Sequence, residues 1–392
     1  MISPKIKVPT PAEILDDLLS IAVESRASDI HFEPEREAFR VRFRIDGILH
    51  PIEVINTSTQ ELIISRIKVL SQMDILEHRL PKDGHFEFPY KNTIYNIRVS
   101  TMPEIYGESI VFRIHSLNEV IHKIENLGLE QEQLKLLQEL IKSPSGMILV
   151  TGPTGSGKTN LLYSILNNLG SEEKNIITLE DPVEYQIKNI RQTSISDSQG
   201  LTFATAMRSV LRQDPDILMV GEIRDGETAL LAIQAALSGI LLFSTFHTFD
   251  LPALVTRLVE MDIPRSIVAQ SIRGVISVRL VRKICNECKE EITPTQEQLA
   301  LLPAEMADGI FYHGSGCGKC QNLGYVGRIG IFEIIDIDDE IRASILDSQS
   351  STAIVEILTK KNIITLRNAA FQKAKKGITT IDEVLRVVGY LK

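Results

Sequence analysis

The chain has 392 residues, of which 43% are hydrophobic and 24% are charged. This balance excludes a largely disordered chain, and the length predicts two or three domains. No apolar run reaches the roughly 18 residues of a membrane span, and the first residues lack the apolar segment of a secretory signal. The net charge of −9 argues against a protein that binds nucleic acid over a broad surface. We therefore expect a cytoplasmic protein that does not insert into a membrane.

The first 115 residues are predicted to form an α+β domain. Helical periodicity is found over 11–26, behind a proline, and again over 58–73. Short runs that alternate between apolar and polar residues predict strands at 30–33, 39–45, 84–89, 94–101 and 110–114.

The rest of the chain follows a different pattern. A polar stretch predicts a linker over 116–130, and an α/β domain follows over 131–392. Four apolar runs predict strands at 147–150, 175–179, 217–220 and 240–244, with helices between them. Apolar strands separated by helices indicate a parallel sheet that is covered on both faces.

A glycine-rich segment between the first of these strands and the next helix matches G-x-x-x-x-G-K-[ST] at every fixed position. Strand, glycine turn and helix are the context in which this motif cradles phosphates, so a chance glycine turn is the weaker interpretation. Lys158 is expected to contact the β and γ phosphates, and Thr159 to bind Mg²⁺. The expected nucleotide-binding residues are Gly152, Pro153, Thr154, Gly155, Ser156, Gly157, Lys158 and Thr159.

Carboxylates follow the next two strands. Glu180 and Glu184 end the strand at 175–179 and are candidates for holding Mg²⁺ or its water shell, although a solvated acidic turn is the alternative. Glu222 ends the strand at 217–220, with Gly221 where a Walker B motif usually has aspartate. Glu222 is the candidate to polarise the attacking water, or it forms a salt bridge with Arg224.

A histidine closes the fourth strand. His247 is a candidate to hydrogen-bond a phosphate, although a lone histidine is more often structural.

Two C-x-x-C pairs predict a structural zinc site within a subdomain at 281–325. Its ligands would be Cys285, Cys288, Cys317 and Cys320, and four thiolates leave no open position for catalysis. Redox dithiols and core cysteines are the alternatives. The basic residues around the first pair, Arg279, Arg282, Lys283 and Lys289, are expected to stabilise thiolates. The helical tail that follows has a capping-box pattern at Thr380 and Glu383.

Six segments together resemble the ATPases of type II secretion and type IV pilus assembly, the GspE/PilB type. The segments are RASDIH at 26–31, RIDG at 44–47, EDPVE at 180–184, the acidic segment at 211–225, STFHT at 244–248 and LVRKIC at 280–285. The resemblance extends over nearly the whole chain and favours pilus assembly or secretion over pilus retraction, because retraction ATPases lack the cysteine module.

The resemblance implies a RecA-like ATPase core that binds ATP, Mg²⁺ and Zn²⁺, and an N-terminal domain of PAS-like type. It implies that ATP lies between the two domains, with Glu222 as the catalytic glutamate and Glu180 and Glu184 assisting Mg²⁺ and water. Arg98 and Arg113 match family arginines that reach the phosphates from the N-terminal domain. Arg208 and Arg212 match further arginines near the nucleotide.

The resemblance further implies a homo-hexamer at the cytoplasmic face of the inner membrane, acting on a membrane platform protein and not on nucleic acid. The chain departs from the family at Ile240, where histidine is usual, and would be a short member without the far N-terminal domain.

The sequence leaves three functions to weigh. The first is an assembly or secretion motor, and the resemblance cannot separate secretion, pili and DNA uptake. The second is a RecA-like nucleic-acid translocase or helicase. The third is a scaffold that binds nucleotide without hydrolysing it, suggested by Ile240.

Overall fold

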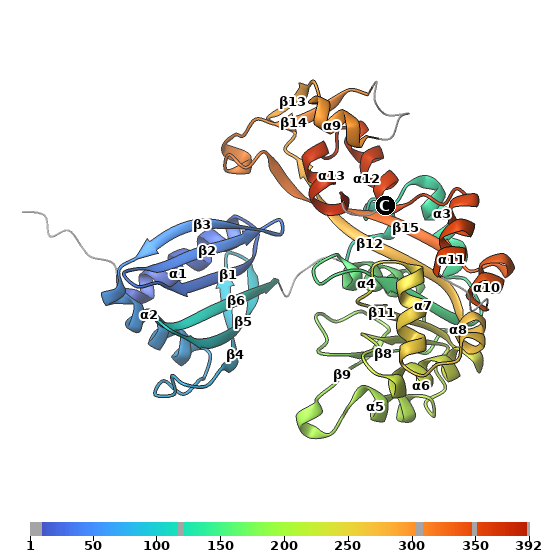
Figure 1. The fold of residues 1–392 in the computed structure, drawn as a ribbon. Helices are drawn as coiled ribbons and strands as arrows, with labels where there is room; N and C mark the ends of the chain where they lie inside the picture. The colour runs from blue at the N-terminus through green and yellow to red at the C-terminus, as the bar shows by residue number, and fades with distance from the viewer. Residues whose placement is uncertain (1–9, 117–120, 303–308, 347–350, 390–392) are drawn as a thin grey trace, which may run out of the picture. The chain divides into compact units, whose positions relative to one another are not determined.

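The computed structural model describes residues 10–116, 121–302, 309–346 and 351–389 (Figure 1). The chain forms two compact units, Met1–Val120 and Ile121–Lys392. Four predicted segments include residues outside the described ones. These are 1–9 in the N-terminal domain, 117–120 in the linker, 303–308 in the zinc subdomain, and 347–350 and 390–392 in the tail.

The first unit is a six-stranded sheet with two helices. All its pairings are antiparallel, in the order β3-β2-β1-β6-β5-β4. Its elements are α1 (Pro11–Glu24), β1 (Ala27–Pro34), β2 (Phe39–Ile45), β3 (Ile48–Ile55), α2 (Thr57–Leu70), β4 (Lys82–Tyr90), β5 (Thr93–Glu104) and β6 (Gly107–Ser116). The sequence pattern missed β3, because this edge strand contains Pro51 and is largely exposed.

The two faces of this sheet differ in chemistry. In β2, alternate apolar residues such as Val41 and Phe43 are buried, and the arginines between them are only half-buried. α1 begins with a capping box between Thr10 and Glu13 and packs against β1 and α2. The opposite face therefore carries the charged side chains, including Arg98 and Arg113.

The second unit is built on a seven-stranded sheet in the order β15-β12-β7-β11-β10-β8-β9, parallel except for the pair of β12 and β15. Its strands are β7 (Gly146–Thr151), β8 (Ile176–Glu180), β9 (Arg191–Ser194), β10 (Ile217–Val220), β11 (Leu241–Phe246), β12 (Ile272–Ile284) and β15 (Tyr325–Asp336), with a separate pair, β13 (Lys289–Ile292) and β14 (Phe311–Gly314). The four predicted strands correspond to β7, β8, β10 and β11.

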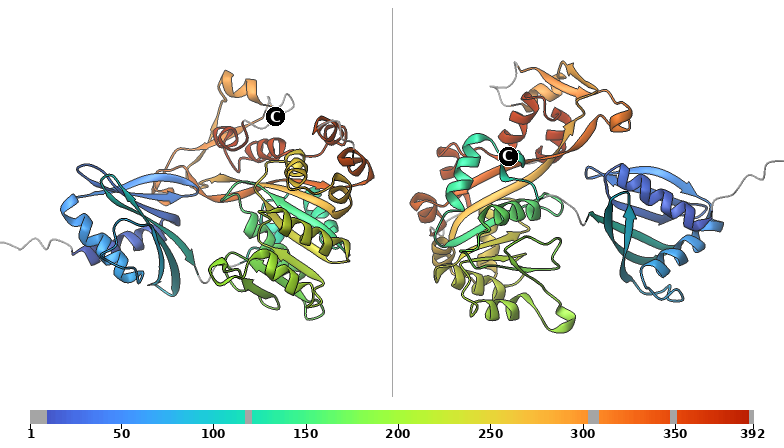
Figure 2. Two further views of the ribbon diagram at one scale, coloured as in Figure 1. Left: turned by 60° about the horizontal axis from the view of Figure 1, so that its bottom comes forward. Right: turned by 180° about the vertical axis from the view of Figure 1, so that it is seen from behind.

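The helices of this unit cover both faces of the sheet (Figure 2). The described helices of the unit are α3 (Gln131–Leu140), α4 (Lys158–Leu169), α5 (Phe203–Val210), α6 (Gly226–Leu237), α7 (Leu251–Glu260), α8 (Arg265–Ser271), α9 (Gln296–Leu301), α10 (Asp339–Leu346), α11 (Ser351–Lys360), α12 (Leu366–Lys375) and α13 (Ile381–Val388), with 3₁₀ turns η1 (Ile124–Asn126), η2 (Asp197–Gln199) and η4 (Gly318–Cys320). Of these, α9 lies beside the separate pair β13 and β14 (Figure 1).

Alternate residues of β7 enter two separate cores. Met147 and Leu149 pack with α5 to α8, and Ile148 and Val150 pack with α3 and α4. β7 is therefore buried on both sides, which explains its unbroken apolar sequence. The described part of the predicted linker joins the second core, where Ile124 is buried.

Only one of the two hydrogen bonds of the predicted capping box at Thr380 and Glu383 is present. Thr380 caps α13 by accepting the Glu383 N–H, but the buried Glu383 carboxylate turns to basic side chains instead. It accepts the Arg282 N–H at 2.9 Å and guanidinium bonds from Arg282 and Arg386. Burial opposes ionisation, yet these donors hold the pKa of Glu383 below its usual value.

We predict that Glu383→Gln lowers the free energy of unfolding of the second unit by about 3 kcal/mol at pH 7, because it leaves the largely buried guanidinium of Arg282 uncompensated. Because the pKa of Glu383 is lowered in the folded state, its carboxylate contributes fully to stability at pH values above the ordinary glutamate pKa. This contribution is lost as the pH falls through the folded-state pKa of Glu383. Denaturant unfolding at pH 7 and pH 3 measures both effects. Asp339→Asn, at a fully exposed side chain, is the control, and equal effects of the two substitutions would contradict the prediction.

Candidate active site and metal centre

The glycine loop connects β7 to α4 in a conformation that only glycine adopts without strain. Gly155 and Gly157 have φ values of +75° and +95°, and Gly157 precedes the first turn of α4. The N-terminus of α4 therefore opens onto the loop, where its unpaired N–H groups favour an anion. The Ser156 hydroxyl is buried there without a hydrogen-bond partner.

Lys158 is folded back onto the loop. Its ammonium group donates to the Gly152 carbonyl at 2.7 Å and the Pro153 carbonyl at 3.1 Å. Burial, with the Arg279 charge, lowers the pKa of Lys158 to about 8, although Glu222 acts in the opposite direction. Keeping Lys158 protonated in this buried position therefore costs free energy, and a bound anion would reduce that cost.

Glu222 lies at the centre of a small charged cluster after β10. Its carboxylate pairs with the Arg224 guanidinium and lies 3.1 Å from Nε2 of His247. Arg224 also reaches Asp181 at 3.3 Å. Burial opposes the shift, but Arg224 and His247 hold the pKa of Glu222 below its usual value, so it is ionised near neutrality. The salt bridge between Glu222 and Arg224, which was the alternative role of this glutamate, is therefore present. The candidate His247 joins the same pair.

Glu180 occupies a different environment. Its carboxylate is buried and accepts hydrogen bonds from Tyr163, from Thr178 at 2.5 Å and from Gln192 at 3.1 Å. The Tyr163 hydroxyl in turn accepts the Glu184 N–H at 3.2 Å, so one tyrosine joins the two predicted carboxylate residues. The sequence pattern contains no signal for Tyr163, because it predicts only an apolar position of the helix there.

Two further candidates, Arg208 and Arg212, contact residues away from the loop. Arg208 pairs with Glu227 of α6, and Arg212 donates to the Arg208 carbonyl at 2.7 Å. Thr159 is half-buried in the first turn of α4.

Ile240 lies at the edge of the sheet opposite to the loop. It precedes β11, whose first residue pairs with Gly146 and whose last pairs with Thr151 beside the loop. At about 3.3 Å per residue, the six residues of β11 separate position 240 from the loop by roughly 20 Å. The side chain at 240 therefore cannot contact phosphates in the loop, and the departure from the family there is no argument against hydrolysis.

Arg98 and Arg113 face each other on β5 and β6 of the first unit. Nε of Arg113 donates to the buried Asp29 carboxylate at 3.1 Å. Burial, then the charges of Arg98 and Arg113, lower the pKa of His115 to about 4, which keeps the imidazole neutral. The two arginines thus lie opposite each other, and Asp29 pairs with one of them.

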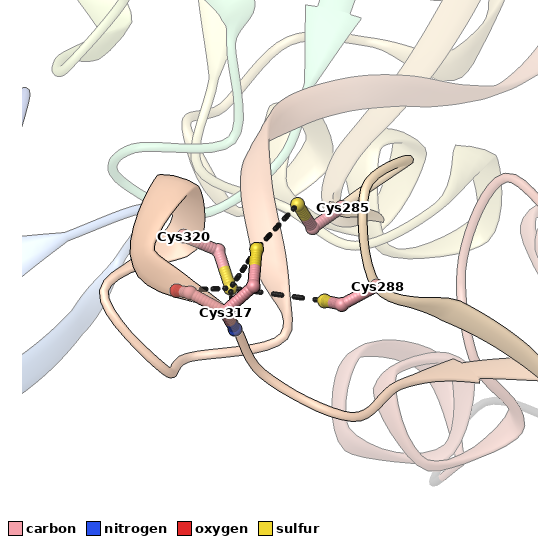
Figure 3. A group of neighbouring side chains, drawn as sticks. All are labelled: Cys285, Cys288, Cys317 and Cys320. Carbon is pink, nitrogen blue, oxygen red and sulfur yellow. Dashed lines mark hydrogen bonds between the residues drawn. The ribbon is translucent and has the colours of Figure 1, made fainter.

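Four cysteine sulfurs converge between the end of β12 and the start of β15 (Figure 3). The sulfur pairs Cys285–Cys317 and Cys288–Cys320 are each 3.8 Å apart, and Cys317–Cys320 is 3.7 Å, too far for a disulfide bond. Backbone N–H groups of Cys317 and Gly324 donate to the Cys320 sulfur at 3.2 and 3.3 Å. The four thiols form a candidate metal centre.

The expected role of the basic residues near the first cysteine pair is wrong for three of them. Arg282 binds Glu383 and stacks 3.9 Å over the Tyr325 ring, and Lys289 lies 4.2 Å over Tyr312. Arg279 lies against the glycine loop instead. Their position in sequence gave no sign of these partners, which come from β15, α13 and the loop.

Comparison with known proteins places this geometry in a family. The model of the family described as "Type II/IV secretion system protein" matches residues 8–386. The chain belongs to this family. The resemblance drawn from the six motifs is therefore confirmed, as is the prediction of a secretion- and pilus-type ATPase fold.

Two relatives show the extent of the similarity. The chain is 42% identical over 390 residues to the type IV pilus assembly ATPase PilB of Thermus thermophilus, covering 97% of this chain but 44% of that protein. It is 42% identical over 374 residues to the type II secretion system protein E of Dickeya dadantii, covering 95% of this chain and 75% of that protein.

Two solved structures share the fold. The ATPase DotB of Legionella pneumophila matches with a TM-score of 0.70 at 22% identity, covering 97% of this chain and 96% of that one. The pilus retraction motor PilT with bound ADP matches with a TM-score of 0.61 at 26% identity, covering 95% and 96%. Within the described residues, the helices are too short or too polar to cross a membrane.

We predict that Lys158→Met removes the thermal shift caused by ATP yet raises the melting temperature without nucleotide at pH 7. The folded-state pKa of Lys158 lies below its ordinary value, so the buried cation destabilises the fold wherever it is protonated. The difference between wild type and variant should shrink as pH rises from about 8 towards 10.5.

Thermal melts with and without ATP at pH 7 and pH 9.5 measure this effect. Lys174→Met, at an exposed residue, is the control. A variant that melts below wild type at pH 7 would contradict the explanation.

Proposed function

We propose that this chain hydrolyses ATP as the motor of type IV pilus assembly or type II secretion. The observation that carries the proposal is the convergence of Lys158, Glu222 and His247 at the carboxyl ends of neighbouring parallel strands, beside an open helix N-terminus. Ligand sites of open α/β sheets lie at this edge. The names of the relatives at 42% identity support the choice of system.

Each residue of the site has a role in this proposal. The loop N–H groups and Lys158 bind the polyphosphate, and the ionised Glu222 orients and polarises the attacking water. His247 and Arg224 hold the Glu222 carboxylate in place. Mg²⁺, when bound through Thr159 with Glu184 and Glu180 nearby, would neutralise charge on the phosphates.

The arginines complete the proposal. Arg98 and Arg113 would contribute positive charge during hydrolysis, as the family resemblance implies, with Asp29 fixing the direction of Arg113. Arg208 and Arg212 are proposed to act near the nucleotide, which requires Arg208 to leave Glu227.

The proposed assembly is a homo-hexamer on the cytoplasmic face of the inner membrane that drives a platform protein. The proposed N-terminal domain is 1–115, the linker is 116–130 and the ATPase domain is 131–392. The antiparallel order of the first unit, with α1 packed on its sheet, supports a PAS-like domain.

We predict that Glu222→Gln lowers kcat for ATP hydrolysis by about 10²–10⁴-fold and leaves the Kd for ATP within a few-fold of wild type, because glutamine cannot polarise water as a carboxylate does. Phosphate release and equilibrium ATP binding are the measurements. Glu260→Gln is the control, because Glu260 lies exposed on α7 and pairs only with a surface arginine.

The same assay separates the other functions. Negligible hydrolysis in both wild type and Glu222→Gln would support a nucleotide-binding scaffold and overturn the motor. Hydrolysis that rises strongly with single-stranded DNA would support a translocase.

We further propose that the four cysteines bind structural Zn²⁺. Four sulfurs placed tetrahedrally at about 2.3 Å from zinc are about 3.8 Å apart, and the three sulfur separations given above are 3.7 to 3.8 Å. The N–H donors to Cys320 suit a thiolate, and all-cysteine ligation leaves zinc without a catalytic position.

We predict that chelation, or Cys317→Ser, increases hydrogen exchange in residues 281–302 and 309–325 while the β7 amides stay protected, because structural zinc contributes about 10–16 kcal/mol to folding small metal sites. Hydrogen exchange by mass spectrometry and metal analysis measure the two effects. Unchanged exchange in the cysteine module after the metal is gone would contradict a structural role.

A further inference from the structure

Two tyrosines join the first turns of α4 to the segment that follows β8. Tyr163 is fully buried, and its ring lies edge-on to the ring of Tyr185 with centroids 4.5 Å apart. The Tyr185 hydroxyl returns to α4, where it donates to Oδ1 of Asn160 at 3.3 Å. Tyr163 follows Thr159 by four residues, so the two side chains share one face of the helix. The segment after β8 is therefore fixed against the face of α4 that begins beside the glycine loop.

The hydroxyl of Tyr163 has fixed donor and acceptor roles. Burial, with the hydrogen bond to Glu180, raises the pKa of Tyr163, so the hydroxyl stays protonated. Its single proton is donated to the Glu180 carboxylate, and its oxygen accepts the Glu184 N–H at 3.2 Å. One hydroxyl group thus ties both ends of the segment 180–184 to α4.

The Glu180 carboxylate is committed to protein donors. Glu180 is only 4% exposed. One of its oxygens accepts from Tyr163, and the other accepts from Thr178 at 2.5 Å and from Gln192 at 3.1 Å. Direct ligation of Mg²⁺ would require the carboxylate to give up at least one of these bonds in a buried place, where an unmade hydrogen bond is costly. The geometry suits Glu180 to fixing the end of β8.

The segment that is fixed in this way reaches the cluster around Glu222. Asp181 follows Glu180 directly, and its carboxylate lies 3.3 Å from the Arg224 guanidinium. Arg224 also pairs with Glu222, which is proposed to polarise the attacking water. A continuous set of contacts therefore runs from Tyr163 on α4, through the end of β8, to Glu222 after β10.

We propose that Tyr163 is a positioning residue of the ATPase site, which fixes the segment 180–184 against α4 so that this segment holds Arg224 and hence Glu222 in place. Glu180 acts through the Tyr163 hydroxyl and not as a ligand of Mg²⁺. The inference rests on the proposed function, because it assumes that Glu222 polarises water during ATP hydrolysis. Since the Tyr163 hydroxyl is bonded within the protein, its loss should slow the chemical step more than it weakens nucleotide binding.

The first test removes only the hydroxyl group. We expect Tyr163→Phe to lower kcat for ATP hydrolysis about tenfold, the equivalent of one hydrogen bond, and to leave the Kd for ATP within about threefold of wild type. Phosphate release and calorimetric ATP binding by the full chain measure both values. An unchanged kcat would overturn the inference, as would a loss of kcat that matches an equal loss of ATP-binding stoichiometry, because Tyr163 would then only support folding.

Tyr325→Phe is the matched control. The Tyr325 hydroxyl lies 2.8 Å from Oγ1 of Thr380 in the tail, and its ring stacks with Arg282. Its loss should lower the melting temperature and leave kcat unchanged. If Tyr325→Phe lowers kcat as much as Tyr163→Phe does, the effect is one of general stability and the inference is overturned.

A double-mutant cycle tests the route to Glu222. Asp181→Asn should lower kcat by itself, and Tyr163→Phe should then cost less than it does in wild type, because both substitutions break the same route. Fully additive losses would overturn the inference. Asp181 is exposed, so this variant should fold even where Tyr163→Phe does not, and an unchanged kcat of Asp181→Asn alone would also overturn the inference.

The magnesium dependence separates the two roles of Glu180. Glu180→Gln and Tyr163→Phe should both lower kcat and should require the same Mg²⁺ concentration for half-maximal hydrolysis, because Glu180 acts through the Tyr163 hydroxyl. A higher Mg²⁺ requirement for Glu180→Gln that Tyr163→Phe does not share would make Glu180 a metal ligand and overturn the inference. If wild type does not hydrolyse ATP, the proposed function fails instead, so the two failures are distinguishable.

Discussion

The parallel register of β12, β7, β11 and β10 is the constraint on which the candidate site depends. Parallel pairing brings the carboxyl ends of these strands to one edge of the sheet, and each strand delivers a different side chain there. β7 delivers the glycine loop, β10 Glu222, β11 His247 and β12 Arg279. These residues are far apart in sequence, and a slip of a single residue in any of the pairings would dismantle the site.

The buried positive charge at the carboxyl edge of the sheet lowers the free energy of unfolding. The loop holds Lys158 in a place from which water is largely excluded, and Glu222 beside it is already paired with Arg224 and His247. The buried ammonium group of Lys158 destabilises the fold, and binding of a polyanion would offset this cost. Glu383 shows the contrasting solution, because its buried carboxylate is fully met by Arg282 and Arg386.

The sequence pattern predicts those features of the fold that depend on residues close together in the chain. The four buried strands of the core were recognisable because they are apolar on both faces, and the glycine loop because its residues are adjacent in sequence. Long-range pairing determines the rest. Arg279 looked like a neighbour of the cysteines, six residues away, until β12 was seen to extend past the loop. Position 240 was expected to matter because the family that the chain resembles usually has histidine there, yet the whole of β11 separates it from the loop. Tyr163 was hidden among apolar positions of α4.

The length of β12 has a mechanical consequence. One continuous strand runs from beside the phosphate loop at Ser277 to the residue before Cys285, and β15 pairs with it along most of that length. A displacement of this strand beside the loop would therefore also move its other end, which precedes the cysteine module. The register of β12 against β15 shifts between Arg282 and Ile284, just before the first cysteine. Arg282 lies at this shift, so its ion pair with Glu383 attaches α13 to the end of the strand that precedes the cysteine module.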